Sequence, residues 1–142
     1  MNKSIIFVFV LLALATPALC DIWTWCGTSA DHLTINSVTI TPDPPVKGQL
    51  LTVTASGTLN EQVTAGNAHI TVKYGFITLI NENQNICSSE NPIPCPIAAG
   101  QYSHTINVTI PSSAPSGKYT GNVVITDQNS QEITCVNVDL DL

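Results

Sequence analysis

The chain has 142 residues, with four lysines, no arginine and ten acidic side chains, for a formal net charge of -6. This length predicts a single domain. The charge argues against nucleic-acid binding, which depends on clustered lysine and arginine. Charged residues are only 10% of the chain and hydrophobic residues 44%, so intrinsic disorder is not expected either. Threonine, asparagine, serine and valine are abundant instead, a composition typical of β-proteins.

The first part of the chain has the pattern of a secretory signal peptide. Lys3 supplies a positive start, residues 5–15 are an unbroken apolar run, and Ala18 and Cys20 place small residues before a cleavage site. The apolar run is shorter than the roughly 20 residues that span a bilayer. We therefore expect residues 1–20 to be removed and residues 21–142 to form one secreted domain. An uncleaved anchor is the alternative.

Four cysteines remain after this cleavage: Cys26, Cys87, Cys95 and Cys135. An even number in a short secreted chain indicates two disulfides, although four cysteines permit three pairings. Cys87 and Cys95 flank a proline-rich loop, so a local bridge between them is the simplest choice; Cys26 and Cys135 would then join the two ends of the domain. Zinc binding is the competing interpretation. Because no Cys-x-x-Cys spacing supports it, we expect no metal site.

Alternation of apolar and polar residues predicts strands along most of the mature chain. Residues 68–74 and 102–110 show it most clearly. Further strands are expected at residues 37–41, 51–56, 76–80, 119–125 and 136–142, with turns at residues 42–45, 66–67, 111–117 and 127–130. About seven strands without helical periodicity predict an all-β fold, an antiparallel β-sandwich of the immunoglobulin-like type.

The predicted strand at residues 102–110 contains the one clean sequon of the mature chain, Asn107-Val108-Thr109. The alternation places Asn107 on the outer, polar face of this strand. Asn107 is therefore a candidate for N-glycosylation, which requires an exposed asparagine in a secreted protein.

Catalytic motifs are not apparent in this sequence. The three histidines, His32, His69 and His104, are scattered, and the alternation places His69 on the outer face and His104 on the inner face. The acidic residues lie mostly in loops and at strand ends, where solvation explains them. We therefore expect no catalytic residues, no cofactor and no enzymatic activity.

The predicted inner faces carry isoleucine, valine, leucine and tyrosine with few polar side chains. An interior of this kind forms either a filled core or an apolar cavity between the sheets. Composition alone does not separate a secreted adhesion domain with a filled core from a protein that encloses an apolar ligand.

Several short motifs follow one another in a specific order and spacing. They are Trp25-Cys26-Gly27, residues 40–49, Gly57-Thr58-Leu59, Val72-Lys73-Tyr74-Gly75, Cys95-Pro96-Ile97 with Gly100, residues 110–119 and Ile133-Thr134-Cys135. Through these motifs the mature chain resembles the ML (MD-2-related lipid-recognition) domain family. The resemblance is strongest to the phosphatidylglycerol/phosphatidylinositol transfer proteins and more distant to the Niemann-Pick C2 sterol carriers.

The resemblance implies a two-sheet sandwich with an apolar lipid cavity and the disulfides Cys26–Cys135 and Cys87–Cys95. It implies transfer of phosphatidylglycerol and phosphatidylinositol between membranes by a monomer that touches membranes transiently and is secreted or endolysosomal. A sterol carrier of the Niemann-Pick C2 type and a secreted adhesion-type sandwich are the alternatives. The sterol carriers have a further cysteine pair in the first third of the domain, and this chain departs from them in having none there.

The family's cavity mouth implicates Leu79, Ile110 and Ala114 of this chain. Some sterol carriers have an aromatic residue where this chain has Ala114, which favours a phospholipid. Together with inward-facing side chains of the predicted strands, these residues make up the expected lipid-binding set: Ile70, Val72, Tyr74, Leu79, Ile97, Tyr102, Ile106, Val108, Ile110, Ala114, Tyr119 and Val123.

Overall fold

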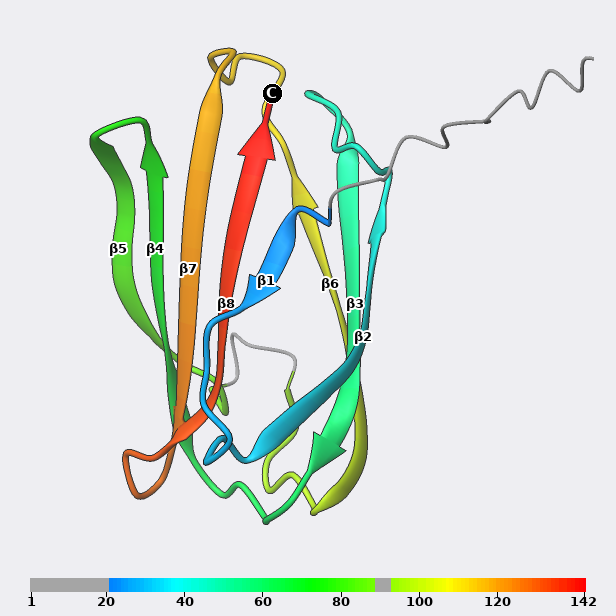
Figure 1. Ribbon diagram of the computed structural model, residues 1–142, viewed down its shortest axis with the longest axis vertical. Helices are drawn as coiled ribbons and strands as arrows, with labels where there is room; N and C mark the ends of the chain where they lie inside the picture. The colour runs from blue at the N-terminus through cyan, green and yellow to red at the C-terminus, as the bar shows by residue number, and fades with distance from the viewer. Residues whose placement is uncertain (1–20, 89–92) are drawn as a thin grey trace, which may run out of the picture.

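The computed structural model describes residues 21–88 and 93–142, which form eight β-strands in two antiparallel sheets (Figure 1). The predicted signal peptide, residues 1–20, lies outside the described residues. The strands are β1 (Trp23–Trp25), β2 (Leu33–Thr41), β3 (Leu50–Leu59), β4 (Gly66–Tyr74), β5 (Ile77–Asn85), β6 (Gly100–Thr109), β7 (Lys118–Asp127) and β8 (Glu132–Asp141). Within these residues no helix is long and apolar enough to cross a membrane.

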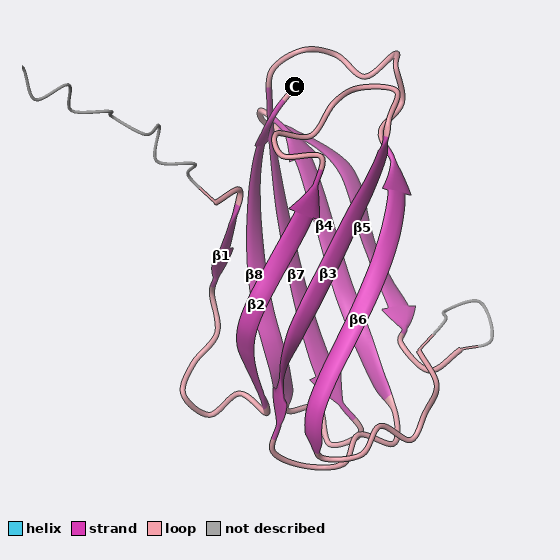
Figure 2. Ribbon diagram, turned by 90° about the vertical axis from the view of Figure 1, so that its right-hand side faces the viewer, coloured by secondary structure: helices cyan, strands magenta, loops and turns pink. Residues whose placement is uncertain are grey.

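The two sheets confirm the predicted all-β sandwich. The five-stranded sheet has the order β1-β8-β7-β4-β5, and the three-stranded sheet has the order β2-β3-β6. Figure 2 shows the smaller sheet lying across the face of the larger one. The sandwich has eight strands, one more than the sequence indicated, because β1 was not predicted. A strand of three residues is too short to show alternation, and β1 forms by pairing with β8, with Trp23 opposite Val138.

The prediction of a turn at residues 66–67 is wrong. Gly66 and Asn67 begin β4, and the chain reverses earlier, between Leu59 and Gly66. Gly66 is required there because a Cβ atom would collide with the carbonyl oxygen of Thr126 and with the side chain of Ile86. Glycine in this strand therefore marks a close approach of neighbouring groups, a role that a strand glycine can have as well as a turn.

The register of the three-stranded sheet separates an apolar inner face from a polar outer face. Val53 of β3 lies opposite Ile106 of β6 on the inner face. On the outer face Thr52 lies opposite Asn107, and the Thr52 hydroxyl donates a hydrogen bond of 2.9 Å to Asn107 Oδ1. Asn107 is exposed, as the alternation predicted.

The five-stranded sheet has the same division between its faces. Ile70 lies opposite Val123 on the inner face, while His69 on the outer face is hydrogen-bonded to Asn83 over 3.0 Å. In the other sheet the His104 ring stacks against the inward-facing Tyr102, with ring centroids 6.2 Å apart. The predicted orientations of the two histidines are thus confirmed.

The hydrophobic core lies at one end of the sandwich, which we call the closed end. Turns at residues 60–65 and 128–131 and the described part of the loop between β5 and β6 meet there (Figure 1). The buried cluster consists of Leu59, Val63, Ala68, Ile86 and Ile133. A backbone bridge between Val63 and Ile97 fastens the loop to the turn.

The opposite end, which we call the open end, carries the turns at residues 42–49, 75–76 and 110–117 (Figure 1). Of the strands in the described ranges, only β2 and β8 bring Cα atoms of the two sheets within 8 Å of each other. On the other side the edge strands β5 and β6 do not approach in this way. The two sheets are therefore closest along the β2–β8 edge.

Two disulfides have the expected pairing. Cys26 is bonded to Cys135, across 109 positions of the chain, and Cys87 is bonded to Cys95, across eight positions. The first bond joins the segment that follows β1 to β8, and the second closes the loop between β5 and β6. The cysteines are thus occupied, which leaves no thiolate of these four for the zinc alternative.

Candidate functional site

The space between the sheets is filled at the closed end and accessible at the open end. Val63 is completely buried at the closed end. Towards the open end, the inner-face residues Ile80, Ile106 and Val108 remain 38%, 46% and 49% exposed. Apolar side chains that face the inside of a sandwich are normally covered by the opposite sheet. Here the opposite sheet leaves them accessible, which forms an apolar surface inside the fold.

A small apolar cavity of about 70 Å³ lies between the sheets next to the core. Its lining consists of Leu33, Leu59, Val63, Ile86, Ile93, Ile97, Tyr102, Ile125 and Ile133. Ligand sites usually measure about 300–1,000 Å³, so this cavity by itself is too small for a lipid. A larger hollow, of about 450 Å³, is lined by outer-face and mostly polar residues such as Thr71 and Asn122, and it is not an apolar site.

Tyr102 is the polar group of the closed-end cavity. Burial raises the pKa of its phenol above the ordinary value. Its hydroxyl is solvent-inaccessible and has no hydrogen-bond partner among the described atoms. A buried hydroxyl without a partner is costly, so Tyr102 offers one directed hydrogen bond to a polar atom that enters the interior.

Two tyrosines hold the 110–117 loop over the open end. The Tyr74 hydroxyl donates to the carbonyl of Ser116 over 2.8 Å, and the Tyr119 hydroxyl donates to the carbonyl of Pro115 over 2.7 Å. The ring centroids of Tyr74 and Tyr119 lie 4.9 Å apart. Lys47, from the turn between β2 and β3, donates to the Ser116 hydroxyl over 2.7 Å. These bonds fix the loop and place a cation beside it.

The rim of the open end is apolar and exposed. Phe76 at the tip of the β4–β5 turn is fully exposed, and Ile77, Leu50 and Val46 are each more than two-fifths exposed. Large exposed apolar side chains gathered at one end of a domain are typical of an interaction surface.

The predicted lipid-binding residues fall into three groups in the structure. Eight lie on the strands whose inner faces border the space between the sheets: Ile70, Val72, Tyr74, Tyr102, Ile106, Val108, Tyr119 and Val123. Ile97 belongs to the closed end, where it packs against the core. The three mouth residues differ: Leu79 is 52% exposed at an irregularity of β5, Ala114 is half-buried in the loop, and Ile110 is only 7% exposed. No single enclosed cavity of the described residues unites all twelve.

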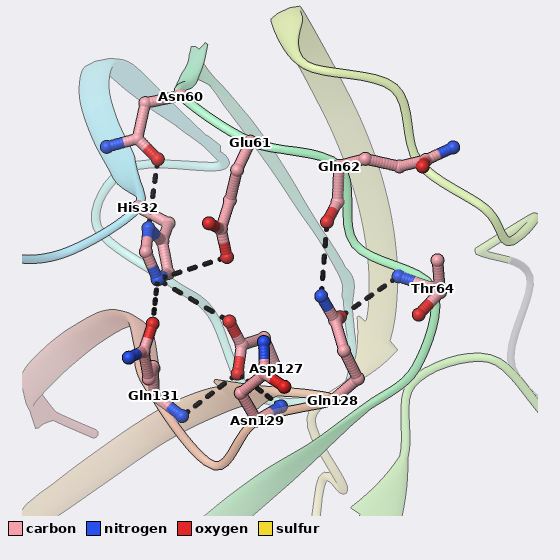
Figure 3. A network of polar contacts seen from close by, with 9 residues as sticks. All are labelled: His32, Asn60, Glu61, Gln62, Thr64, Asp127, Gln128, Asn129 and Gln131. Carbon is pink, nitrogen blue, oxygen red and sulfur yellow. Dashed lines mark hydrogen bonds and ion pairs between the residues drawn. The ribbon is translucent and has the colours of Figure 1, made fainter.

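Sequence reasoning missed a polar cluster at the closed end (Figure 3). His32, Glu61 and Asp127 come from three separate parts of the chain and meet through the sheet topology. Burial acts to lower the pKa of His32, but hydrogen bonds to Asn60 and Gln131 and the nearby carboxylates outweigh it, so the pKa is raised. No local spacing connects these positions, so the sequence carried no signal of the cluster.

Asp127 shows the opposite balance. Burial favours its neutral form, but backbone N–H groups of Gln131 and Asn129, the Glu61 side chain and the His32 ring favour the carboxylate, so its pKa is lowered. Glu132, close by, has a raised pKa because burial and the carboxyl group of Asp31 both disfavour its charge. The closed end is thus held by charged and hydrogen-bonded groups as well as by the apolar core.

The fold and the accessible interior define a β-sandwich that can admit an apolar ligand between its sheets, and the comparison with known families agrees. The family model of the ML domain matches residues 21–142. The chain therefore belongs to the ML domain family. The match covers every described residue, including both disulfides and both ends of the sandwich.

Named relatives share most of this length. A Neurospora crassa phosphatidylglycerol/phosphatidylinositol transfer protein is 38% identical over 119 residues, covering 79% of this chain and 67% of that protein. A Mycosarcoma maydis protein of the same name is 32% identical over 123 residues, covering 83% of this chain and 64% of that protein. A Dictyostelium discoideum protein, provisionally assigned the same activity by its name, is 56% identical over 140 residues and covers 99% of both chains.

Solved structures show the same fold. A Niemann-Pick type C2 protein from the Japanese carpenter ant has a TM-score of 0.66 and 14% identity, covering 84% of this chain and 98% of its own. Chicken MD-1, solved in complex with lipid IVa, has a TM-score of 0.63 and 14% identity, covering 84% of this chain and 87% of its own. At this identity the likeness concerns the fold alone.

Proposed function

We propose that this protein is a non-catalytic lipid carrier that binds phosphatidylglycerol or phosphatidylinositol and transfers it between membranes. The observation that carries the proposal is the apolar inner surface that Ile80, Ile106 and Val108 leave accessible towards the open end. A domain that had evolved around a filled core would cover these side chains with the opposite sheet. The transfer activity named for relatives that are 32–38% identical supports the same ligand class.

The mechanism is desolvation without bond chemistry. Acyl chains leave a bilayer and enter the space between the sheets, and each buried CH₂ group is worth about 0.8 kcal/mol in either environment. The exchange is then nearly balanced. The protein accelerates it because the chains never cross water unshielded. Loading would separate the sheets at the open end, where Ile80 of β5 and Ile106 and Val108 of β6 are already accessible.

The anionic head group would stay at the open end, in water. Lys47 and Lys118 lie at the turns there, Lys47 beside Ser116 and Lys118 at the start of β7. A lysine near a charged lipid surface contributes about 1 kcal/mol, screened by salt. With so few cations, selectivity among head groups should be weak and the salt dependence of transfer shallow.

Membrane contact would occur through the apolar rim of the open end. Phe76 projects fully into solvent from the two-residue turn between β4 and β5, and the exposed Ile77 follows it. An exposed aromatic ring is suited to the interface of a bilayer, where its apolar body is buried. Such contact would bring the accessible open end close to the acyl chains.

The proposed compartment is the secretory route, ending outside the cell or in endolysosomes, with the protein acting as a monomer. Two disulfides support an oxidising environment. Cleavage of residues 1–20 and glycosylation of Asn107 belong to the same proposal, and the exposed position of Asn107 supports the second.

The decisive experiment combines lipid identification with a transfer assay. Native mass spectrometry of the purified mature protein should detect one bound glycerophospholipid per chain. Transfer between vesicles should then be faster for phosphatidylglycerol and phosphatidylinositol than for a sterol. Faster sterol transfer would favour the Niemann-Pick C2 type of carrier, and a lipid-free protein without transfer activity would favour the adhesion-type alternative.

A further inference from the structure

Three side chains of metal-ligating type converge at the closed end, opposite the proposed lipid entrance (Figure 3). His32 precedes β2, Glu61 lies in the turn between β3 and β4, and Asp127 is the last residue of β7. His32 Nε2 lies 3.1 Å from Glu61 Oε1 and 3.4 Å from Asp127 Oδ2. One ligand atom from each residue lies within 4.8 Å of the other two.

Around His32 Nε2, acceptor oxygen atoms outnumber hydrogen-bond donors. Gln131 Oε1 is a third oxygen near His32 Nε2, at 3.0 Å, whereas one ring N–H donates a single well-aligned hydrogen bond. Asp127 is only 4% exposed, and its Oδ2 accepts no hydrogen bond from any described atom; the same is true of Glu61 Oε1. Buried carboxylate oxygens without donors are stabilised by a nearby cation, which can be the protonated His32 ring or a bound metal ion.

The remaining atoms of the cluster are already held in place. Asp127 Oδ1 accepts the backbone N–H groups of Asn129 and Gln131, at 2.8 and 2.9 Å. His32 Nδ1 bonds to Asn60 Oδ1 over 2.9 Å. These bonds orient the ring and the carboxylate so that Nε2 and Oδ2 point into a common space. Metal-binding histidines and carboxylates are oriented by outer hydrogen bonds of this kind.

We propose that His32, Glu61 and Asp127 bind one divalent ion of the zinc class, with Gln131 Oε1 or a water as the fourth ligand. Zinc bonds of about 2.0–2.2 Å in a tetrahedron place ligand atoms roughly 3.3–3.6 Å apart, close to the observed 3.1 and 3.4 Å. A neutral imidazole and two carboxylates neutralise a divalent ion. Calcium prefers six to eight oxygen ligands, which this set does not supply.

The bound ion would have a structural role. It would tie the segment before β2, in the smaller sheet, to the β3–β4 turn and to the end of β7 in the larger sheet. Metal binding to the folded state alone adds to stability, and the gain grows with the logarithm of the free metal concentration above Kd. The closed end would thereby be fixed while the open end remains free to separate.

The test uses the mature, disulfide-bonded protein without a polyhistidine tag, stripped with EDTA. Calorimetric titration with zinc chloride should give one site per chain, and calcium chloride should give none. At a free zinc concentration of a hundred times Kd, the thermal midpoint should rise by roughly 5–10 °C. Binding of cobalt should produce the absorption of a tetrahedral site.

Glu61→Gln is the variant of choice because it removes one ligand charge from a turn while keeping the side chain's size. It should bind zinc at least tenfold more weakly, and its thermal shift at the same free zinc concentration should fall to about half or less. Glu82→Gln, on the exposed part of β5, is the matched control and should behave as the unmodified protein. Absence of zinc binding, or equal affinity in Glu61→Gln, would overturn the site. Neither result would affect the lipid assays.

Discussion

At the scale of single residues, neighbours on one strand meet different surroundings. On β6, Ile106 points between the sheets and is 46% exposed, whereas Thr105 points outwards and is hydrogen-bonded to Thr54 over 3.0 Å. The alternation of a strand produces this difference. It also supplies a matched pair for testing where the ligand lies.

Ile106→Asp should reduce lipid uptake at least tenfold while the protein still folds. The new carboxylate stays within reach of water, so folding is tolerated, but acyl chains packed against it would desolvate it at a cost of several kcal/mol. Bound lipid is measured by native mass spectrometry and folding by circular dichroism. Thr105→Asp, on the outer face, should take up lipid normally. Equal uptake by the two variants would place the ligand elsewhere.

At the scale of elements, the β4–β5 hairpin extends the rim of the open end. Its turn places Gly75 at a φ of 57°, where glycine is favoured, and a Cβ atom there would meet nothing within 4 Å. The turn is therefore free of tertiary contacts at that position. Its fully exposed Phe76 is available to a membrane surface.

Phe76→Ser should slow vesicle-to-vesicle transfer about fivefold or more, since about 1 kcal/mol of interfacial burial is lost. Lipid already bound should be retained, because the ring does not line the interior. Co-sedimentation with anionic vesicles and a fluorescence transfer assay provide the measurements. Phe76→Leu, which keeps an apolar side chain, is the control and should transfer nearly normally. A serine variant that docks and transfers at full rate would refute membrane contact by this turn.

The two disulfides constrain elements of very different separation. Cys26–Cys135 closes 109 positions and Cys87–Cys95 closes eight. The chain-entropy model assigns them about 4.8 and about 2.5 kcal/mol of stabilisation. Replacing Cys26 and Cys135 by alanine should therefore lower the free energy of unfolding by about 2 kcal/mol more than replacing Cys87 and Cys95. Urea unfolding under non-reducing conditions measures both. Equal losses would show that native contacts outweigh loop entropy.

At the scale of the whole molecule, the sandwich is asymmetric. The core, the Cys87–Cys95 bond and the polar cluster lie at the closed end, whereas exposed apolar side chains collect at the open end. Stability and ligand access are therefore separated along the strands. Such a division lets the sheets separate at one end without unfolding the other.

Processing of the whole chain is testable by intact mass. We expect cleavage between Cys20 and Asp21, which removes the fifth cysteine, Cys20, and leaves the four that form disulfides. The secreted protein should then show no alkylation without reductant and four alkylated cysteines after reduction. Treatment with a glycosidase reports occupancy of Asn107 separately. An alkylatable thiol in the unreduced protein would contradict this cleavage position.

Local patterns determined which residues face inwards. The alternation around Ile70 and around Ile106 was sufficient, because strand geometry sends successive side chains to opposite faces, and it placed His69, His104 and Asn107 correctly. The family resemblance identified both disulfides. Periodicity failed where structure depends on a partner: β1 exists through pairing with β8, and Gly66 is required by Thr126 and Ile86.

Only the tertiary structure decided how the two sheets meet. The sequence made the inner faces apolar, but it contained no information about whether they cover each other, since that depends on how the two sheets are placed: they are closest at β2 and β8 and leave Ile80, Ile106 and Val108 accessible. The tertiary structure likewise brought His32, Glu61 and Asp127 together from distant positions. Side-chain direction is a local property of the backbone, whereas the filling of an interior and the assembly of a cluster are set by contacts between segments far apart in the chain.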